Sequence, residues 1–238
     1  MPKKPPSTSK GIFSDIRFFF LDKPETATKI KFHSEDERFL YSKSILQRTG
    51  IEVDDFKVLN IHHIGIEAPA SFVFEELLKW NGDSSCWPNH IAKITLKDGK
   101  LEHIKVNLFG WPSDPFSPKK GIAGLQLFHL FNMNAIKIQT TPEPFDFDNA
   151  RFLLYKCSGG YPIGVFLMYV RTSLPERGEK EMSQLFMMVG FNFWGNKTLT
   201  RFHFITKTWE AVHNRATSHI LDRLKQLSEW RFEKFTNQ

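Results

Sequence analysis

The chain has few of the features that mark secreted, membrane-spanning or metal-binding proteins. It contains two cysteines, Cys86 and Cys157, whose spacing fits neither a disulfide framework nor a zinc site. No apolar run approaches the ~20 residues needed to cross a bilayer, and the first residues lack the apolar stretch of a signal peptide. These absences predict a cytoplasmic protein with reduced thiols and no transmembrane segment.

Motifs for nucleotide binding and for the common hydrolases are also missing. The sequence has no Walker-type loop, no G-x-S-x-G and no Rossmann glycine pattern, and Gly159-Gly160 is better explained as a turn. His213 and His219 do not stand three or four residues apart, the spacing that would let two ligands on one helix share a metal. We therefore expect no catalytic motif, no metal site and no cofactor.

The charges and aromatic residues narrow the class of partner. The formal net charge of +6 is moderate, and basic and acidic residues alternate in most segments, which favours solubility over dedicated nucleic-acid binding. The sequence contains 24 phenylalanines, which must lie in a core, an interface or a ligand cavity. A chain of 238 residues fits one large domain with an N-terminal extension.

Residues 196–235, near the C-terminus, have the pattern of one long amphipathic helix. No Gly or Pro interrupts the segment after Gly195. Apolar residues recur at steps of three and four, the spacing that lines one face of a helix. They are Leu199, Phe202, Ile205, Trp209, Val212, Ala216, Ile220, Leu224 and Leu227. So long a helix needs a broad partner surface, and the strand-like segments upstream can supply it.

The N-terminal fifty residues divide into a tail and an extension. Residues 1–10 are rich in Lys, Pro and Ser and predict a disordered basic tail. Residues 11–52 contain an apolar patch at 12–21 and a capping-box pattern, Ser34-Glu35-Asp36-Glu37, which predicts a helix near 35–48. This extension is too small to hold a core, so we expect it to dock on the main domain or on a partner subunit.

In the main domain, residues 53–238, the sequence pattern predicts a first strand at 57–67 and a short helix at 70–80. A meander of strands follows. Asp98-Gly99 between segments 91–97 and 101–109 predicts a hairpin. Further strand segments lie at 125–133, 135–140, 151–157, 163–172 and 182–193, and residues 132–134 fit either a turn or a bulge. Short connections predict a mostly antiparallel sheet.

Several of these strands are apolar on both faces. Leu185, Met187 and Val189 alternate with Phe186 and Met188, whereas a sheet with one wet face should alternate with polar residues. We therefore expect the outer face to be covered, either by the extension or by a second copy of the chain in a homodimer.

The predicted element order resembles the helix-grip fold of the START and Bet v 1-like superfamily, also called SRPBCC. Residues 66–74, IEAPASFVF, resemble the family's opening I-x-A-P-x-x-x-V-F, and Trp87-Pro88 falls where many members have an aromatic-proline pair. The resemblance covers residues 55–236 and implies an α+β fold with a curved antiparallel sheet wrapped around a long C-terminal helix. It also implies a deep cavity between them that binds apolar molecules such as lipids, sterols or polyketides.

The leading hypothesis is a non-catalytic protein that binds or transports an apolar small molecule in this cavity. The candidate lining residues are Trp87, Phe109, Trp111, Phe128, Tyr169, Phe191, Phe202 and Trp209. On the terminal helix, Arg215, His219 and Asp222 share one side, either as a solvated network or with one group leaning over the cavity mouth.

Two alternatives use the same fold. One is an enzyme of the cyclase, aromatase or hydratase type, with His62 or His63 as general acid or base; alternation sends one imidazole to each face of the sheet. The other is a protein-interaction module with a collapsed cavity that uses the apolar outer sheet face.

Overall fold

The computed structural model describes residues 31–49, 58–79, 92–97, 100–108, 132–140, 149–159, 163–174, 180–191 and 202–238, with scattered positions between 13 and 30. The elements of these segments, in chain order, are α2 (Glu35–Arg48), β1 (Val58–Ile66), α3 (Ala70–Leu78), β2 (Ala92–Lys97), β3 (Lys100–Leu108), β4 (Asn132–Thr140), β5 (Arg151–Gly159), β6 (Ile163–Thr172), β7 (Ser183–Phe191) and α4 (His203–Thr236). The predicted α+β class is confirmed.

Within the described segments the strands form one seven-stranded sheet in the order β1-β7-β6-β5-β4-β3-β2, and neighbouring strands pair antiparallel. The first strand pairs with the last, from Val58 opposite Phe191 to Ile66 opposite Ser183. Strands β2 to β7 are neighbours in the sheet in the order of the chain, and one long-range closure places β1 beside β7.

The structure tests two local predictions for the sheet, the hairpin at Asp98-Gly99 and the turn or bulge at residues 132–134. The hairpin is confirmed, because β2 and β3 pair antiparallel from Ala92 opposite Leu108. Residues 132–134 lie inside the continuous strand β4, and the irregularity in its pairing with β5 falls instead between Lys137 and Gln139. Residues 125–131, expected to form a strand, lie outside the described residues.

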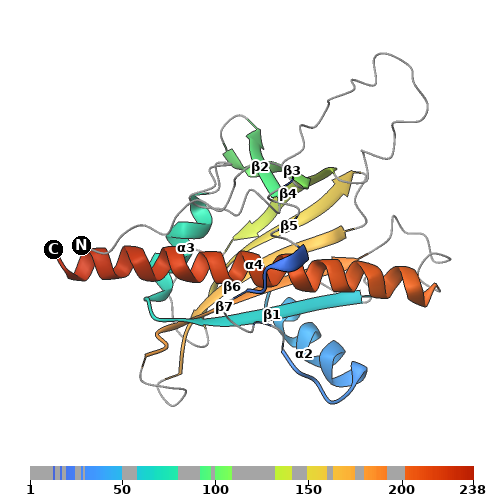
Figure 1. Ribbon diagram of the computed structural model, residues 1–238, viewed down its shortest axis with the longest axis horizontal. Coiled ribbons are helices and arrows are strands. Elements are labelled where there is room, and N and C mark those ends of the chain that lie inside the picture. Colours follow the sequence, from blue (N-terminus) through green and yellow to red (C-terminus); the bar gives the residue numbers. More distant parts are fainter. Residues whose placement is uncertain are drawn as a thin grey trace.

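The long terminal helix is confirmed over the part that the structure describes. Helix α4 has 34 residues from His203 to Thr236, and residues 196–201 lie outside the described residues. At about 1.5 Å per residue its axis is roughly 50 Å long. It packs mainly against β1 and α3 and crosses in front of the sheet, as the helix-grip arrangement requires (Figure 1).

An inner apolar cluster joins helices α3 and α4 to one face of the sheet. Its buried members from the strands come from β1, β5, β6 and β7, and the helices α3 and α4 close over them. They include Ile64, Ile66, Leu153, Tyr155, Phe166, Met168, Val170, Leu185, Met187, Val189 and Phe191, with Phe74, Leu77, Ile220, Leu221 and Leu224 from the helices.

An outer apolar cluster lies on the opposite face, beneath α2. Ile45 and Leu46 of α2 pack there with Phe152, Leu167 and other outward side chains of β1, β5, β6 and β7. One of the two expected covers, the N-terminal extension, therefore occupies this face. Because α2 fills the position, the structure gives no support to a homodimer through the same surface; the domain boundaries at residues 10 and 52 stay predictions.

The predicted capping pattern begins α2. The hydroxyl of Ser34 accepts a hydrogen bond from the backbone N–H of Glu37 at 3.0 Å, and the Glu37 carboxylate accepts one from the N–H of His33 at 2.6 Å. Both bonds satisfy backbone donors near the helix start. The helix predicted near 35–48 is confirmed.

Candidate functional site

The two halves of α4 are buried to different extents. In the C-terminal half, Ile220, Leu221 and Leu224 are buried in the inner cluster. In the N-terminal half, Ile205, Trp209 and Val212 pack against the same cluster but stay only partly buried, and Phe202 and Phe204 are 55% and 82% exposed. The apolar surface that α4 presents to the sheet is therefore incompletely covered at its N-terminal half.

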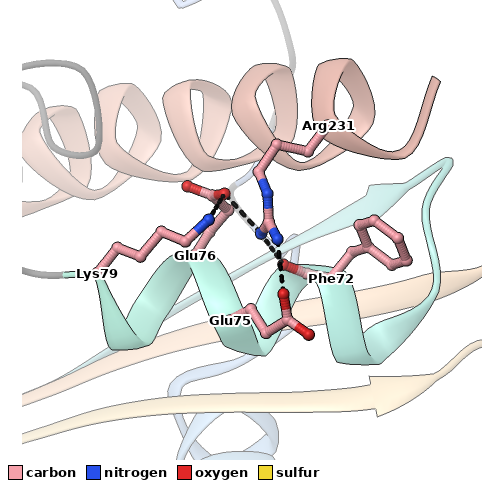
Figure 2. A network of polar contacts seen from close by, with 5 residues as sticks. All are labelled: Phe72, Glu75, Glu76, Lys79 and Arg231. Carbon is pink, nitrogen blue, oxygen red and sulfur yellow. Dashed lines mark hydrogen bonds and ion pairs between the residues drawn. The ribbon is translucent and has the colours of Figure 1, made fainter. Parts of the chain in front are cut away.

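An ionic network fixes the opposite, C-terminal half of α4 to α3. The Arg231 guanidinium donates to the carboxylates of Glu76 at 2.7 Å and Glu75 at 2.6 Å, and Lys79 pairs with Glu76 at 3.1 Å (Figure 2). Burial by itself lowers the pKa of Arg231, but the hydrogen bonds and charges of the two glutamates outweigh it and raise that pKa. The guanidinium also lies over the Phe72 ring, 5.4 Å from its centroid. This end of the helix is held by both packing and charge.

Aromatic side chains from β7 and α4 meet at the N-terminal half. The Phe191 ring is fully buried and packs edge-on against the His213 imidazole, with 4.5 Å between ring centroids. Trp209 lies one helical turn before His213, with 6.0 Å between their rings. Val212 packs beside them on the inner cluster.

Asn60 of β1 adds a polar group to the same face. It stands opposite Val189 and diagonal to Phe191 across the β1–β7 pair, a separation of about 7–8 Å. The side chain is 5% exposed, and its amide nitrogen has no hydrogen-bond partner among the described residues. We define the candidate ligand site as Asn60, Phe191, Ile205, Trp209, Val212 and His213.

His213 is a neutral, structural histidine within this site. Its Nδ1–H donates to the backbone carbonyl of Trp209 at 2.8 Å. Burial lowers the pKa of the imidazole to about 4, and the hydrogen bond to Trp209 offsets only part of this effect. The ring is therefore uncharged at neutral pH.

The two adjacent histidines of β1 point to opposite faces, as alternation predicts. His62 is fully buried on the inner face; its Nε2 donates to Oδ1 of Asn214 at 2.8 Å, and its Nδ1 is 2.9 Å from the Thr28 hydroxyl. His63 stacks on Phe186 of the outer cluster, with 5.4 Å between ring centroids. His62 thus joins β1, α4 and the N-terminal extension, and both histidines have structural surroundings.

Thr28 is the point where the extension meets both β1 and α4. Besides the contact with His62, its hydroxyl lies 2.8 Å from that of Ser218, and its carbonyl accepts the N–H of His63 at 3.0 Å. The Thr28 side chain is buried. We call the four side chains Thr28, His62, Asn214 and Ser218 the Thr28 junction.

Arg215, His219 and Asp222 lie together on one side of α4, but beside the extension. Arg215 donates to the backbone carbonyl of Asp22 at 2.6 Å, and both His219 and Asp222 are buried. Burial, aided by the charge of Arg215, lowers the pKa of His219 to about 4. Of the two alternatives that the sequence left open, a solvated network does not fit His219 and Asp222, because both side chains are buried.

The predicted lining residues are distributed unevenly. Phe191 and Trp209 lie at the candidate site, and Phe202 lies exposed at the start of α4. Tyr169 does not belong with them: it lies in the outer cluster, packed edge-on against Phe186, because odd-numbered residues of this part of β6 point away from α4. The remaining four, Trp87, Phe109, Trp111 and Phe128, lie outside the described residues.

Sequence reasoning missed Asn60 and His213. Asn60 is the one amide in the inward set of β1, Asn60, His62, Ile64 and Ile66, and this position in an otherwise apolar neighbourhood was the available signal. His213 falls beside the apolar stripe of the terminal helix. The ligand-binding role of all these residues stays a prediction, as does the cavity itself.

Other kinds of site find no support in the part of the chain that is described. There, no group of three or more His, Cys, Asp or Glu side chains is placed to hold a metal ion. Likewise, none of the described helices has the length and apolar character needed to span a membrane. Cys157 is a free, buried thiol, and burial raises its pKa.

Known proteins give no sequence match and a distant structural similarity. No protein-family model and no curated protein sequence matches this chain. Among solved structures it is similar to the Polyketide_cyc-like protein Cgl2372 from Corynebacterium glutamicum, determined by solution NMR, at 12% sequence identity and a TM-score of 0.32. The similarity covers 75% of this chain and 92% of that protein. The strand order and the position of α4 define the helix-grip architecture; no ligand or activity follows from this likeness.

Proposed function

We propose that this protein binds or transports an apolar small molecule, held between the inner sheet face and the N-terminal half of α4. The observation that supports this is the partly exposed state of Ile205, Trp209 and Val212 on the helix face that packs toward the sheet. Covering such surface is favourable by about 25 cal/mol per Å² of apolar area. A cytoplasmic location is part of the same proposal.

The alternatives have less support. A general acid or base must reach the substrate, yet His62 is fully buried with both ring nitrogens in contact with polar side chains, and His63 packs on the outer cluster. An interaction module that uses the outer sheet face would compete with Ile45 and Leu46 of α2, which pack there.

The test is binding of a neutral fluorescent apolar probe, 1-N-phenylnaphthylamine, together with native mass spectrometry after mild purification. We expect the wild-type chain to bind the probe, and Trp209→Ala to weaken binding at least tenfold. Trp230→Ala is the matched control, since Trp230 lies toward the C-terminal end of the same helix, where Lys234 packs over its ring at 5.7 Å. Trp230→Ala should leave the affinity unchanged.

Two results would contradict the proposal. One is a folded wild-type chain that neither retains a ligand nor binds the probe. The other is an equal loss of affinity in both tryptophan variants, which would place the probe away from the N-terminal half of α4.

A further inference from the structure

Asn60 differs from its neighbours in how its polar atoms are satisfied. Along the inward set of β1, Ile64 and Ile66 are apolar, and His62 has a polar partner near each ring nitrogen. Asn60 is also buried, with 5% of its surface exposed, but its amide nitrogen has no hydrogen-bond partner in the described part of the chain. Native proteins leave few buried donors in this state, so each one requires an explanation.

The surroundings of Asn60 indicate what would satisfy it. Val189 stands opposite on β7, and Phe191 lies on the diagonal, where it packs against His213 of α4. Asn60 therefore presents two N–H donors among apolar and aromatic side chains, at the end of the sheet where α4 is incompletely covered. An oxygen atom of a bound molecule is the complementary group.

The charge of the site limits that molecule further. The polar side-chain groups of the candidate ligand site are the Asn60 amide and the Trp209 indole N–H, both neutral, and the His213 imidazole, whose pKa burial lowers to about 4. None of the three can balance a carboxylate or phosphate brought out of water, and an unbalanced buried charge is strongly unfavourable. Glu210, on the same half of α4, is paired with Arg38 of α2 at 2.7 Å.

We infer that the ligand is uncharged and largely apolar, and that it carries one carbonyl or hydroxyl oxygen that accepts a hydrogen bond from the side-chain amide of Asn60. This inference rests on the proposed function and names the ligand class for the same site. Burial of the hydrocarbon part supplies most of the affinity, and Asn60 selects molecules with an oxygen at the matching position.

A pair of matched probes tests the inference. 2-Acetylnaphthalene and 2-ethylnaphthalene have nearly the same shape and differ in one carbonyl oxygen, and both can be measured by displacement of 1-N-phenylnaphthylamine from the full chain. We expect the wild-type chain to bind the ketone about tenfold more tightly than the hydrocarbon, because only the ketone satisfies the buried donor.

The variant Asn60→Leu removes the amide and keeps the branched shape of the side chain, with a larger volume. It should bind the two probes equally, through a loss of affinity for the ketone with the hydrocarbon affinity kept. The variant should be at least as resistant to urea as the wild type, because no buried donor is left unsatisfied. Asn60→Val serves as a second variant, since valine favours a strand.

The outcomes separate the two proposals. Equal binding of both probes by the wild-type chain, or a ketone preference that persists in Asn60→Leu and Asn60→Val, would overturn the role of Asn60 while leaving apolar binding intact. Failure of all three probes to bind the wild-type chain would instead overturn the proposed function, and the inference with it.

Discussion

The two halves of α4 share one helix and one apolar stripe, yet they are used differently. In the C-terminal half, Ile220, Leu221 and Leu224 are buried against α3 and the sheet, and Arg231 adds ion pairs to two carboxylates of α3. The N-terminal half keeps apolar side chains partly exposed over a buried amide and a neutral imidazole. The C-terminal half therefore stabilises the fold, whereas the N-terminal half is where we propose that a ligand binds.

The largest expected effect compares cavity-forming substitutions in the two halves. Leu224 is fully buried in the inner cluster, so Leu224→Ala should lower the free energy of unfolding by about 2–5 kcal/mol. Val212→Ala in the N-terminal half should cost about 1 kcal/mol or less, because Val212 is only partly buried. Urea unfolding monitored by circular dichroism measures both. Similar losses in the two variants would remove the distinction between the halves.

The ionic network at the C-terminal half should have the next largest effect. Arg231→Met leaves the buried Glu76 carboxylate with Lys79 as its described ion-pair partner, and we expect a loss of about 2–3 kcal/mol in the free energy of unfolding. Arg231→Lys keeps the charge without the two-pronged geometry and should lose less. Combining Arg231→Met with Glu76→Gln should recover part of the stability. A further loss would show that the unpaired Glu76 carboxylate does not cause the destabilisation of Arg231→Met.

The pH dependence of stability tests whether the N-terminal half of α4 contains a buried neutral imidazole, His213. The folded-state pKa of His213, about 4, lies below the usual value of about 6.5, so between these values the unfolded chain binds a proton that the folded chain does not. The contribution of neutral His213 to the free energy of unfolding is complete above pH 6.5. It falls as the pH is lowered, and about 2 kcal/mol of it is lost at pH 5. His213→Phe should therefore show a flatter loss of stability between pH 7.5 and 5, with His219 responsible for part of the remaining slope. If the free energy of unfolding depends on pH in the same way in the wild type and in His213→Phe, His213 is not a buried neutral group.

The smallest expected effect concerns the Thr28 junction. Thr28→Val keeps the shape but removes the hydroxyl that contacts His62 and Ser218, and should lower the free energy of unfolding by about 1 kcal/mol. Thr28→Ser retains the hydroxyl and should lose less. Equal losses from the two variants in urea unfolding would assign the effect to packing of the methyl group instead.

Much of the architecture could be predicted because local patterns and the fold agree. The three-and-four spacing from Ile205 to Leu227 predicts α4, Asp98-Gly99 predicts the hairpin of β2 and β3, and Ser34 with Glu37 predicts the start of α2. Each of these signals is contained within a few residues of the element that it specifies.

The candidate site could be predicted only in part, because burial at a site is set by residues far apart in the chain. Tyr169 was placed on the wrong face since both alternating sets of β6 are apolar, and periodicity then does not distinguish inside from outside. The importance of Asn60 depends on where α4 lies, and that of Thr28 on how the extension crosses β1.

The Thr28 junction has a consequence for where the folding unit begins. A shortened chain that starts at residue 53, the boundary expected from the helix-grip pattern, would leave His62 without its hydroxyl neighbour and the outer cluster without Ile45 and Leu46. Efforts to produce the sheet and α4 as a shorter protein should therefore retain the sequence from before Thr28. The residues that precede position 53 contribute packing and hydrogen bonds to the same folded unit as the sheet and α4.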